Sequence, residues 1–284
     1  MEQQLIQIRD QQRQTWDKFS PGWKKWDEHV LSWLAPVGEA LIRNARLQET
    51  SHLLDVAAGT GEPGLTAARI VVKGKVTVTD LSDRMLEVAA EKAARRGIRN
   101  LETRQCDAGA MPFDDDSFDA VTCRFGFMFF PDIGLGLEEM VRVAKPGARI
   151  CSAVWAGPDS NPWATTVLSA IAAHVEMPPA APDAPGLFRC AAPGFMARAY
   201  EDARIGNVTE TDIASEVEFQ TPELYWTFMT EIAAPVVAGL ARADASTQEA
   251  IRRAVLDRVS LDSGSGKVKF PWRARVTSGE KTGV

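Results

Sequence analysis

The stretch "HLLDVAAGTGEPGLTAARI", residues 52–70, decides the fold. A short apolar run ends in Asp55, and three glycines follow in the spacing G-x-G-x-x-G, at Gly59, Gly61 and Gly64. Such glycines let the backbone approach a ligand and let a helix pack close to the preceding strand. The stretch therefore predicts a strand, a glycine loop and a helix that together bind a nucleotide-containing ligand. Glycines that serve tight packing alone are the alternative.

Strand-like and helix-like segments alternate outward from this stretch, up to about residue 155. The strand-like segments are residues 52–58, 75–80, 101–107, 118–124 and 148–155, and the helix-like ones are 62–71, 82–97 and 134–147. The second helix begins after Ser82, a good N-cap, and stops at Gly97, a good residue to follow a helix. Strands that alternate with helices indicate βαβ units and a parallel sheet.

The pattern breaks after residue 156. Pro- and Gly-rich loops surround one expected helix at residues 163–175. A helical stretch at 222–258, interrupted at Pro235 and around Asp244 to Ser246, lies between two late strands at 207–219 and 267–279. Because Pro271 cannot donate a ladder hydrogen bond, we expect the well-paired part of the last strand to start near Trp272. The C-terminus is thus predicted to complete the sheet, with a helical cap inserted between its strands.

Composition and charge exclude several classes of protein. The formal net charge of −6 argues against a nucleic-acid partner, because nucleic-acid binding depends on Lys and Arg that neutralise phosphates. The N-terminus lacks the apolar core of a signal peptide, and no segment reaches the roughly 20 apolar residues of a membrane span. The four cysteines form no CxxC pair, and the three histidines lack the spacing of metal ligands. We expect a cytoplasmic protein with reduced thiols, no metal and no membrane span.

Three acidic residues indicate which ligand the glycine loop binds. Asp55 precedes the glycines, and Asp80 and Asp107 end the next two strands, where they can accept hydrogen bonds from a ribose and from an adenine amino group. A carboxylate at Asp55 would repel the diphosphate of NAD but attract the ammonium of a methionine moiety. A cationic ligand with a ribose and an adenine fits all three, which indicates S-adenosylmethionine.

The motifs "LLDVAAGTGEPG", "VTVTDLSDRMLEVA", "CDAGAMPFDDDSFDAV" and "EEMVRVAKPGARI" resemble those of the class I S-adenosylmethionine-dependent methyltransferases. The group that contains the ubiquinone and menaquinone biosynthesis C-methyltransferases is the most similar, over about residues 50–155. The resemblance implies an α/β, Rossmann-like, seven-stranded and mostly parallel sheet with helices on both faces, whose last strand is antiparallel. Ala57 stands where these enzymes often have Gly, and the C-terminal signature of the quinone enzymes is missing. A quinone precursor is therefore only an alternative substrate.

From the motifs and this resemblance we assign residues to a cofactor site for S-adenosylmethionine: Asp55, Ala57, Gly59, Thr60, Gly61, Asp80, Leu81, Met85, Cys106, Asp107, Ala108, Arg124 and Phe125. The domain division that follows is an N-terminal helical lid at 1–45, a cofactor-binding core at 46–156, a helical cap over the acceptor site at 157–205 and 221–262, and strands that complete the core sheet at 206–220 and 263–284.

Aromatic residues supply the expected acceptor site. The segment "RFGFMFFPD" (124–132) follows the fourth strand, and the N-terminal segment carries four tryptophans, whose exposure would be costly. We expect the acceptor to contact Trp23, Trp26, Phe125, Phe127, Phe188 and Arg189. Arg124 either orients an anionic acceptor or pairs with an acid.

A methyl sulfonium is already electrophilic, so alignment of the acceptor is the main requirement, and a base is needed only where the acceptor must lose a proton. The candidates for such a base are His29, in the tryptophan-rich segment, and then His174. Helix or surface packing is the alternative role for both.

The sequence thus predicts a methyltransferase that moves a methyl group from S-adenosylmethionine to a small molecule by in-line displacement. Whether the accepting atom is O, N, C or S stays open, as does a homodimer. A quinone-precursor C-methyltransferase is the first alternative, followed by an NAD-dependent oxidoreductase and a non-catalytic nucleotide-binding protein.

Overall fold

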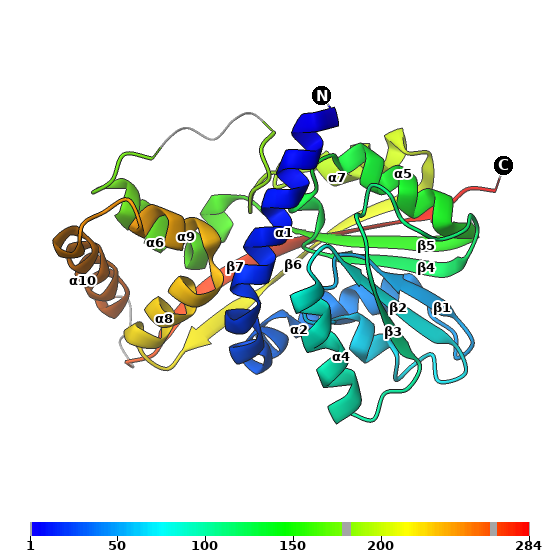
Figure 1. Cartoon of the computed structure of the whole chain (residues 1–284), viewed down its shortest axis with the longest axis horizontal. Helices are drawn as coiled ribbons and strands as arrows, with labels where there is room; N and C mark the ends of the chain where they lie inside the picture. Colours follow the sequence, from blue (N-terminus) through cyan, green and yellow to red (C-terminus); the bar gives the residue numbers. More distant parts are fainter. Residues whose placement is uncertain (1, 178–182, 262–265, 284) are drawn as a thin grey trace.

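A seven-stranded sheet forms the centre of the molecule (Figure 1). The computed structural model describes residues 2–177, 183–261 and 266–283. The strand order is β3-β2-β1-β4-β5-β7-β6, in which β1 to β5 pair in parallel and β7 is antiparallel to both of its neighbours. The strands are β1 His52–Asp55, β2 Lys75–Asp80, β3 Leu101–Gln105, β4 Phe118–Arg124, β5 Ala144–Trp155, β6 Ile205–Phe219 and β7 Val268–Lys281. The predicted fold class is confirmed.

Helices precede, connect and extend this sheet. The α-helices are α1 Glu2–Lys25, α2 Asp27–Ala45, α3 Gly64–Ala67, α4 Asp83–Arg95, α5 Ile133–Val143, α6 Pro162–Ala172, α7 Phe195–Asp202, α8 Pro222–Ile232, α9 Ala234–Leu240 and α10 Ala245–Leu261. Two short 3₁₀ helices, η1 Phe127–Phe129 and η2 Pro158–Ser160, complete the set. None of the helices within the described ranges is both long and apolar enough to cross a membrane.

Helices cover both faces of the sheet, as side-chain alternation along β5 shows. Arg149 donates to the backbone oxygen of Asn44 in α2, and Trp155 stacks on Trp33 of the same helix. Ser152 points to the opposite face of β5, and its hydroxyl accepts a hydrogen bond from Tyr200 of α7. Since successive side chains of a strand point to opposite faces, α2 and α7 lie on opposite sides of β5.

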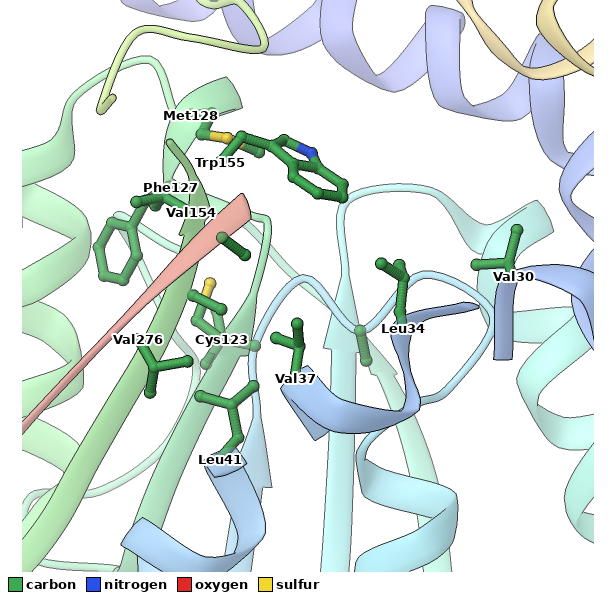
Figure 2. Close-up of a cluster of buried hydrophobic side chains, with 14 of the residues drawn as sticks. Val30, Leu34, Val37, Leu41, Cys123, Phe127, Met128, Val154, Trp155 and Val276 are labelled. Atoms are coloured by element: carbon green, nitrogen blue, oxygen red, sulfur yellow. The ribbon is translucent and has the colours of Figure 1, made fainter. Parts of the chain in front are cut away.

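The α2 helix supplies much of the core next to the site. Leu34, Val37 and Leu41 come from one face of α2 and lie toward Cys123 of β4 and Val276 of β7 (Figure 2). All of these side chains are at most 3% exposed. Their spacing along α2 matches the helical period, so burial of this face fixes α2 against the sheet.

Several boundaries differ from the expectation. The helix expected at 62–71 is only α3, four residues long, because the chain after Ala67 continues in tighter turns, such as the bond from the Ile70 N–H to the Ala67 oxygen. The stretch 222–258 is divided into α8, α9 and α10, with breaks close to the expected interruptions at Pro235 and Asp244 to Ser246. Residues 178–182 of the expected Pro-rich loop, and 262–265 at the junction of the expected cap and last strand, lie outside the described residues.

The last strand begins close to the expected residue 267, but its pairing begins earlier than the expected Trp272. The strand β7 pairs with β6 from Val268 onward, and Pro271 lies opposite Glu216 within that ladder. Pairing of β7 with β5 begins only at Ala274. At Pro271, β7 therefore has a strand on one side only, and a missing N–H donor costs little there.

The loop between β1 and α3 needs glycine at Gly61 for two reasons. Its φ of +100° lies in the left-handed region, and a Cβ there would lie 2.8 Å from Cδ1 of Leu65 and 2.9 Å from Cβ of Ala89. Gly59 also has a positive φ, of +54°, but a Cβ there would meet nothing within 4 Å. The loop is thus packed tightly at Gly61 against α3 and α4, and it is open at Gly59.

This difference predicts distinct costs for two glycine substitutions. Gly61→Ala should lower the free energy of unfolding by about 2–4 kcal/mol, since it adds overpacking to backbone strain. Gly97→Ala is the matched control, because Gly97 has a φ of +67° but open space around a Cβ, and it should cost only about 1 kcal/mol. Chemical denaturation of both variants checks this, and equal costs would contradict the packing argument.

Candidate functional site

Four charged residues end neighbouring parallel strands at one edge of the sheet. Asp55 ends β1, Asp80 ends β2, Asp107 lies two residues beyond β3, and Arg124 ends β4. Ligands of open α/β sheets bind at the carboxyl ends of the strands. The sequence prediction that these residues belong to one crevice therefore agrees with the strand order β3-β2-β1-β4.

Asp55 is fully buried and holds three elements together. Its Oδ2 accepts a hydrogen bond from the Gly64 backbone N–H at the start of α3 (2.8 Å), and its Oδ1 accepts one from the hydroxyl of Thr122 in β4 (2.7 Å). Burial raises the pKa of this carboxyl to about 7, against the lowering effect of the two hydrogen bonds. Asp55 thus anchors the end of the glycine loop, at Gly64, to β1 and β4.

Asp80 joins the glycine loop to the start of α4. Its Oδ2 accepts from the Gly59 N–H (2.8 Å) and its Oδ1 from the Ser82 N–H (2.9 Å). Burial raises its pKa to about 6, and the nearby Asp17 adds to this rise. Each carboxylate oxygen has two acceptor positions, so the pair can accept further hydrogen bonds from a ligand.

Asp107 lies at the β3 end of the crevice. Its Oδ1 accepts from the Gly109 N–H (2.9 Å), and its Oδ2 is 3.9 Å from an Nη1 of Arg9 in α1. These residues also line a small pocket with apolar walls from Leu5 and Leu135. The predicted adenine end of the site is therefore closed from outside by the first helix.

The first helix, α1, crosses in front of β7 in Figure 1 and contacts both α4 and α8. Asp17 accepts from the Ser82 hydroxyl (2.6 Å), and Lys24 pairs with Glu91 of α4 (2.5 Å). The ring of Trp16 contacts that of Phe129 after β4, with centroids 5.0 Å apart. α1 thereby contacts the segments that follow three of the crevice strands.

The start of α2 is joined to the glycine loop by a buried lysine. The side chain of Lys92 in α4 is 2% exposed and donates to Oδ1 of Asp27 (2.7 Å) and to the backbone oxygen of Thr60 (2.8 Å). The Thr60 hydroxyl donates to the same Asp27 oxygen (2.9 Å). Burial lowers the pKa of Lys92, while Asp27 opposes that change.

Aromatic rings form a wall beside the end of β4. Phe125 has a φ of +61° and stacks on Trp155, with centroids 4.3 Å apart and planes at 13°. Trp33 of α2 stacks on Trp155 at 5.6 Å and meets the edge of Trp163 at 4.7 Å. We call Trp33, Phe125, Trp155 and Trp163 the aromatic wall.

His29 lies next to this wall in α2. Its ring contacts Trp26, Phe219 and Phe228, with centroids 4.9–6.0 Å apart. Its buried Nε2 has no hydrogen-bond partner among the described residues. Burial lowers its pKa below the ordinary 6.5, so the ring is neutral at pH 7.

Two predicted residues lie elsewhere than expected, and a third, Arg189, contacts the expected acceptor segment. Phe127 is fully buried and packs on Phe130, because the η1 turn directs it into the core seen in Figure 2; this corrects its assignment to the acceptor. His174 is exposed at the end of α6, with Nδ1 2.9 Å from the Ala170 oxygen, and does not join the crevice. Arg189 donates from Nη1 to the Phe130 oxygen, so it joins the Pro-rich segment to the β4 loop.

The other predicted cofactor residues lie around the loops of the crevice. Met85 is buried in the first turn of α4, where its N–H donates to Ser82. The backbone oxygen of Leu81 accepts from Gln105, and Cys106 and Ala108 flank Asp107 and are partly buried. Burial raises the pKa of Cys106 to about 11, so its thiol stays protonated. Ala57 has a φ of +53°, which explains why Gly is common there in the enzymes it resembles.

Sequence reasoning missed the residues that fasten the first two helices, above all Lys92 and Asp27. One signal for Lys92 was present, since it follows Met85, Val88 and Ala89 at helical spacing on the apolar face of α4. A lysine at such a position needs a buried partner. Asp27 carries no comparable signal.

Comparison with known proteins shows which family this site resembles. Residues 37–164 match the model of the ubiE/COQ5 methyltransferase family. The chain is 42% identical over 139 residues to the ubiquinone/menaquinone biosynthesis C-methyltransferase UbiE of Brucella canis, over 47% of each chain. It is 38% identical over 122 residues to the uncharacterized protein Rv1405c of Mycobacterium tuberculosis, over 43% of each. The match thus spans less than half the length of these relatives.

Solved structures share the fold. A putative methyltransferase from Bacillus halodurans superposes with a TM-score of 0.58 at 19% identity, over 87% of this chain and 99% of the other. The family match confirms the sequence-based resemblance to methyltransferases over residues 37–164, and the solved structure shares the fold.

The buried Asp55 predicts a particular pH dependence of stability. Between pH 4 and 7 the folded state holds a proton on Asp55 that the unfolded state has released, so stability falls as the pH rises through this window. From pH 6 to 8 the wild type should lose about 1.4 kcal/mol relative to Asp55→Asn, whose amide can bond both Gly64 and Thr122.

Asp119→Asn is the control for this measurement. Lys145 and the His52 N–H lower the pKa of Asp119, so its contribution is lost only in acid, and this variant should follow the wild type from pH 6 to 8. Urea denaturation at several pH values gives all three curves. Parallel curves for the wild type and Asp55→Asn would show that Asp55 does not titrate in this range.

Proposed function

We propose that this chain, whose residues 37–164 match the ubiE/COQ5 methyltransferase family, transfers a methyl group from S-adenosylmethionine to a small-molecule acceptor. One observation carries the proposal. The Asp80 carboxylate lies at the carboxyl edge of the sheet, bonds the glycine loop at Gly59, and keeps acceptor positions for a ribose. Activity, cofactor and substrate are all part of the proposal.

The residues present fit this cofactor. A Cβ at Gly59 would point into open space, so a ligand can approach the backbone there. Asp80 would accept from the ribose hydroxyls, and Asp107 from the adenine amino group, once Arg9 releases it. When bound, the cofactor supplies a methyl group on a sulfonium, which is already electrophilic. The chain has to orient an acceptor and exclude water.

The N-terminal helices are suited to exclude water. Through Asp17, Lys24 and Asp27, α1 and α2 are bonded to segments around the crevice. We propose that α1 is the moving part of the lid expected at 1–45, and that it opens for the cofactor and closes for the reaction about its junction with α2. Closure removes water that would otherwise compete with the acceptor.

The aromatic wall is the proposed place of the acceptor. Phe125 is partly buried at the end of β4 and stacks on the buried Trp155, and Trp23, Trp26 and Phe188 are the further contacts expected from the sequence. The partly buried rings of Trp23, Trp26, Phe125 and Phe188 favour a flat or apolar acceptor. A quinone precursor is such a molecule, and the UbiE relative keeps a quinone-precursor C-methyltransferase as the second candidate.

The remaining expectations belong to the same proposal. A cytoplasmic location, a small-molecule partner and the exclusion of nucleic acid stay predictions, and the chain carries a formal charge of −6 that favours the last of these. A homodimer stays open. An NAD-dependent oxidoreductase is the weaker alternative, because the buried Asp55 beneath the glycine loop disfavours a diphosphate there.

Titration calorimetry with S-adenosylhomocysteine tests the cofactor site. We expect Asp80→Ala to weaken binding by about 2–3 kcal/mol, since the ribose loses a charged acceptor. Asp83→Ala, at an exposed position in the first turn of α4, is the control and should bind as the wild type does. Transfer of a labelled methyl group to a panel of phenols, amines and thiols then identifies the acceptor. Binding of NAD in place of S-adenosylhomocysteine would refute the proposal.

The pH–rate profile tests His29 as the base. A base must be neutral, and burial lowers the pKa of His29, so kcat/KM should fall only below about pH 6.5. His29→Gln should lower the rate about 100-fold and remove this acidic limb. If His174→Gln has this effect instead, the base is His174. Unchanged profiles in both variants would mean that the acceptor needs no histidine base.

A further inference from the structure

Arg124 lies at the crevice, and its guanidinium has no direct partner among the described residues. It is partly buried at the end of β4, and within the ranges 2–177, 183–261 and 266–283 nothing makes a hydrogen bond or ion pair with its guanidinium. Unpaired buried guanidinium groups are rare, because desolvation of the charge is costly. Burial indeed lowers the pKa of Arg124, and its neighbours Glu62, Asp55 and Asp27 only partly offset this.

Strand register places the side chain of Arg124 above the glycine loop. Thr122 of β4 is the register partner of Asp55, and the two side chains are hydrogen-bonded. Arg124 is two residues further along the same strand, so it projects from the same face, one step beyond the end of β1. The chain after Arg124 also approaches the loop, because a Cβ at Gly126 would lie 2.7 Å from that of Ala57.

The three acids near Arg124 already have other partners. Asp55 is bonded to Gly64 and Thr122, and Glu62 (4% exposed) pairs with Arg96 at 2.7 Å. Asp27 pairs with Lys92. With its neighbouring carboxylates engaged elsewhere, the guanidinium is left available to an anion that lies on the glycine loop.

We propose that Arg124 binds the carboxylate of the amino-acid end of the cofactor, and that it makes this site selective for cofactors that keep that carboxylate. The inference rests on the proposed function. An arginine can bond a carboxylate through two parallel N–H groups, which gives geometric specificity as well as affinity. It would hold the methionine end over Gly59 and Gly61, while Asp80 bonds the ribose.

A comparison of two ligands isolates this contact. S-adenosylhomocysteine and its decarboxylated analogue, S-adenosyl-3-thiopropylamine, differ only in the carboxylate. By calorimetry the wild type should bind S-adenosylhomocysteine about 10- to 100-fold more tightly than the analogue. Arg124→Met should lose most of this ratio, through weaker binding of S-adenosylhomocysteine and nearly unchanged binding of the analogue. Arg124→Lys should keep an intermediate ratio, because it keeps the charge without the fork.

Arg104→Met is the matched control. Arg104 is an exposed arginine in β3, which β2 and β1 separate from β4, and its loss should leave both affinities unchanged. Equal binding of the two ligands by the wild type would overturn the assignment of Arg124, with no need of a folded variant, while leaving the cofactor in place. Failure of the wild type to bind either ligand would overturn the proposed function itself, and the assignment with it.

A third result would give Arg124 another role. If Arg124→Met keeps the ratio of the two affinities but loses kcat/KM for the acceptor, the guanidinium serves an anionic acceptor. That result would also overturn the assignment to the cofactor.

Discussion

The buried carboxylate of Asp55 is the constraint on which the crevice depends. It accepts from the N–H that begins α3 and from the hydroxyl of Thr122, so β1, β4 and the glycine loop share one fixed point. A charge at such a position is costly, which is why its pKa rises to about 7. In return the glycine loop is bonded at two places, at Gly64 by Asp55 and at Gly59 by Asp80. The same pairing of Asp55 with Thr122 sets the face of β4 from which the Arg124 side chain projects.

A second set of contacts determines access to this crevice. Arg9, Asp17 and Lys24 of α1 contact Asp107, Ser82 and Glu91, which follow the ends of β3 and β2. Two of these contacts are partly exposed ion pairs, which contribute at most about 1 kcal/mol each. The junction at Asp27 and Lys92 is buried and costly to break. α1 is thus held weakly along its length and firmly at its end, as suits a helix that opens about its junction with α2.

The sequence was sufficient for the fold and for the acids of the site. Asp55 and Asp80 end strands whose pattern is clear, and Asp107 follows the end of a third strand. Their meeting at one edge of the sheet therefore follows from parallel topology alone. Phe127 was misassigned because one 3₁₀ turn decides whether a ring faces the core or the crevice, and no periodicity reports such a turn. The partners of Asp27 and Arg189 depend on contacts between distant segments, which a single sequence does not encode in its spacing.

The crystal structure of the protein with S-adenosylhomocysteine tests the central claim most directly, namely that this edge of the sheet is a site for the methyl donor. The account predicts density across the glycine loop, with the ribose hydroxyls within hydrogen-bond distance of Asp80 and the adenine beside Asp107. Density for the ligand elsewhere in the molecule, or a ribose without contact to Asp80, would contradict it.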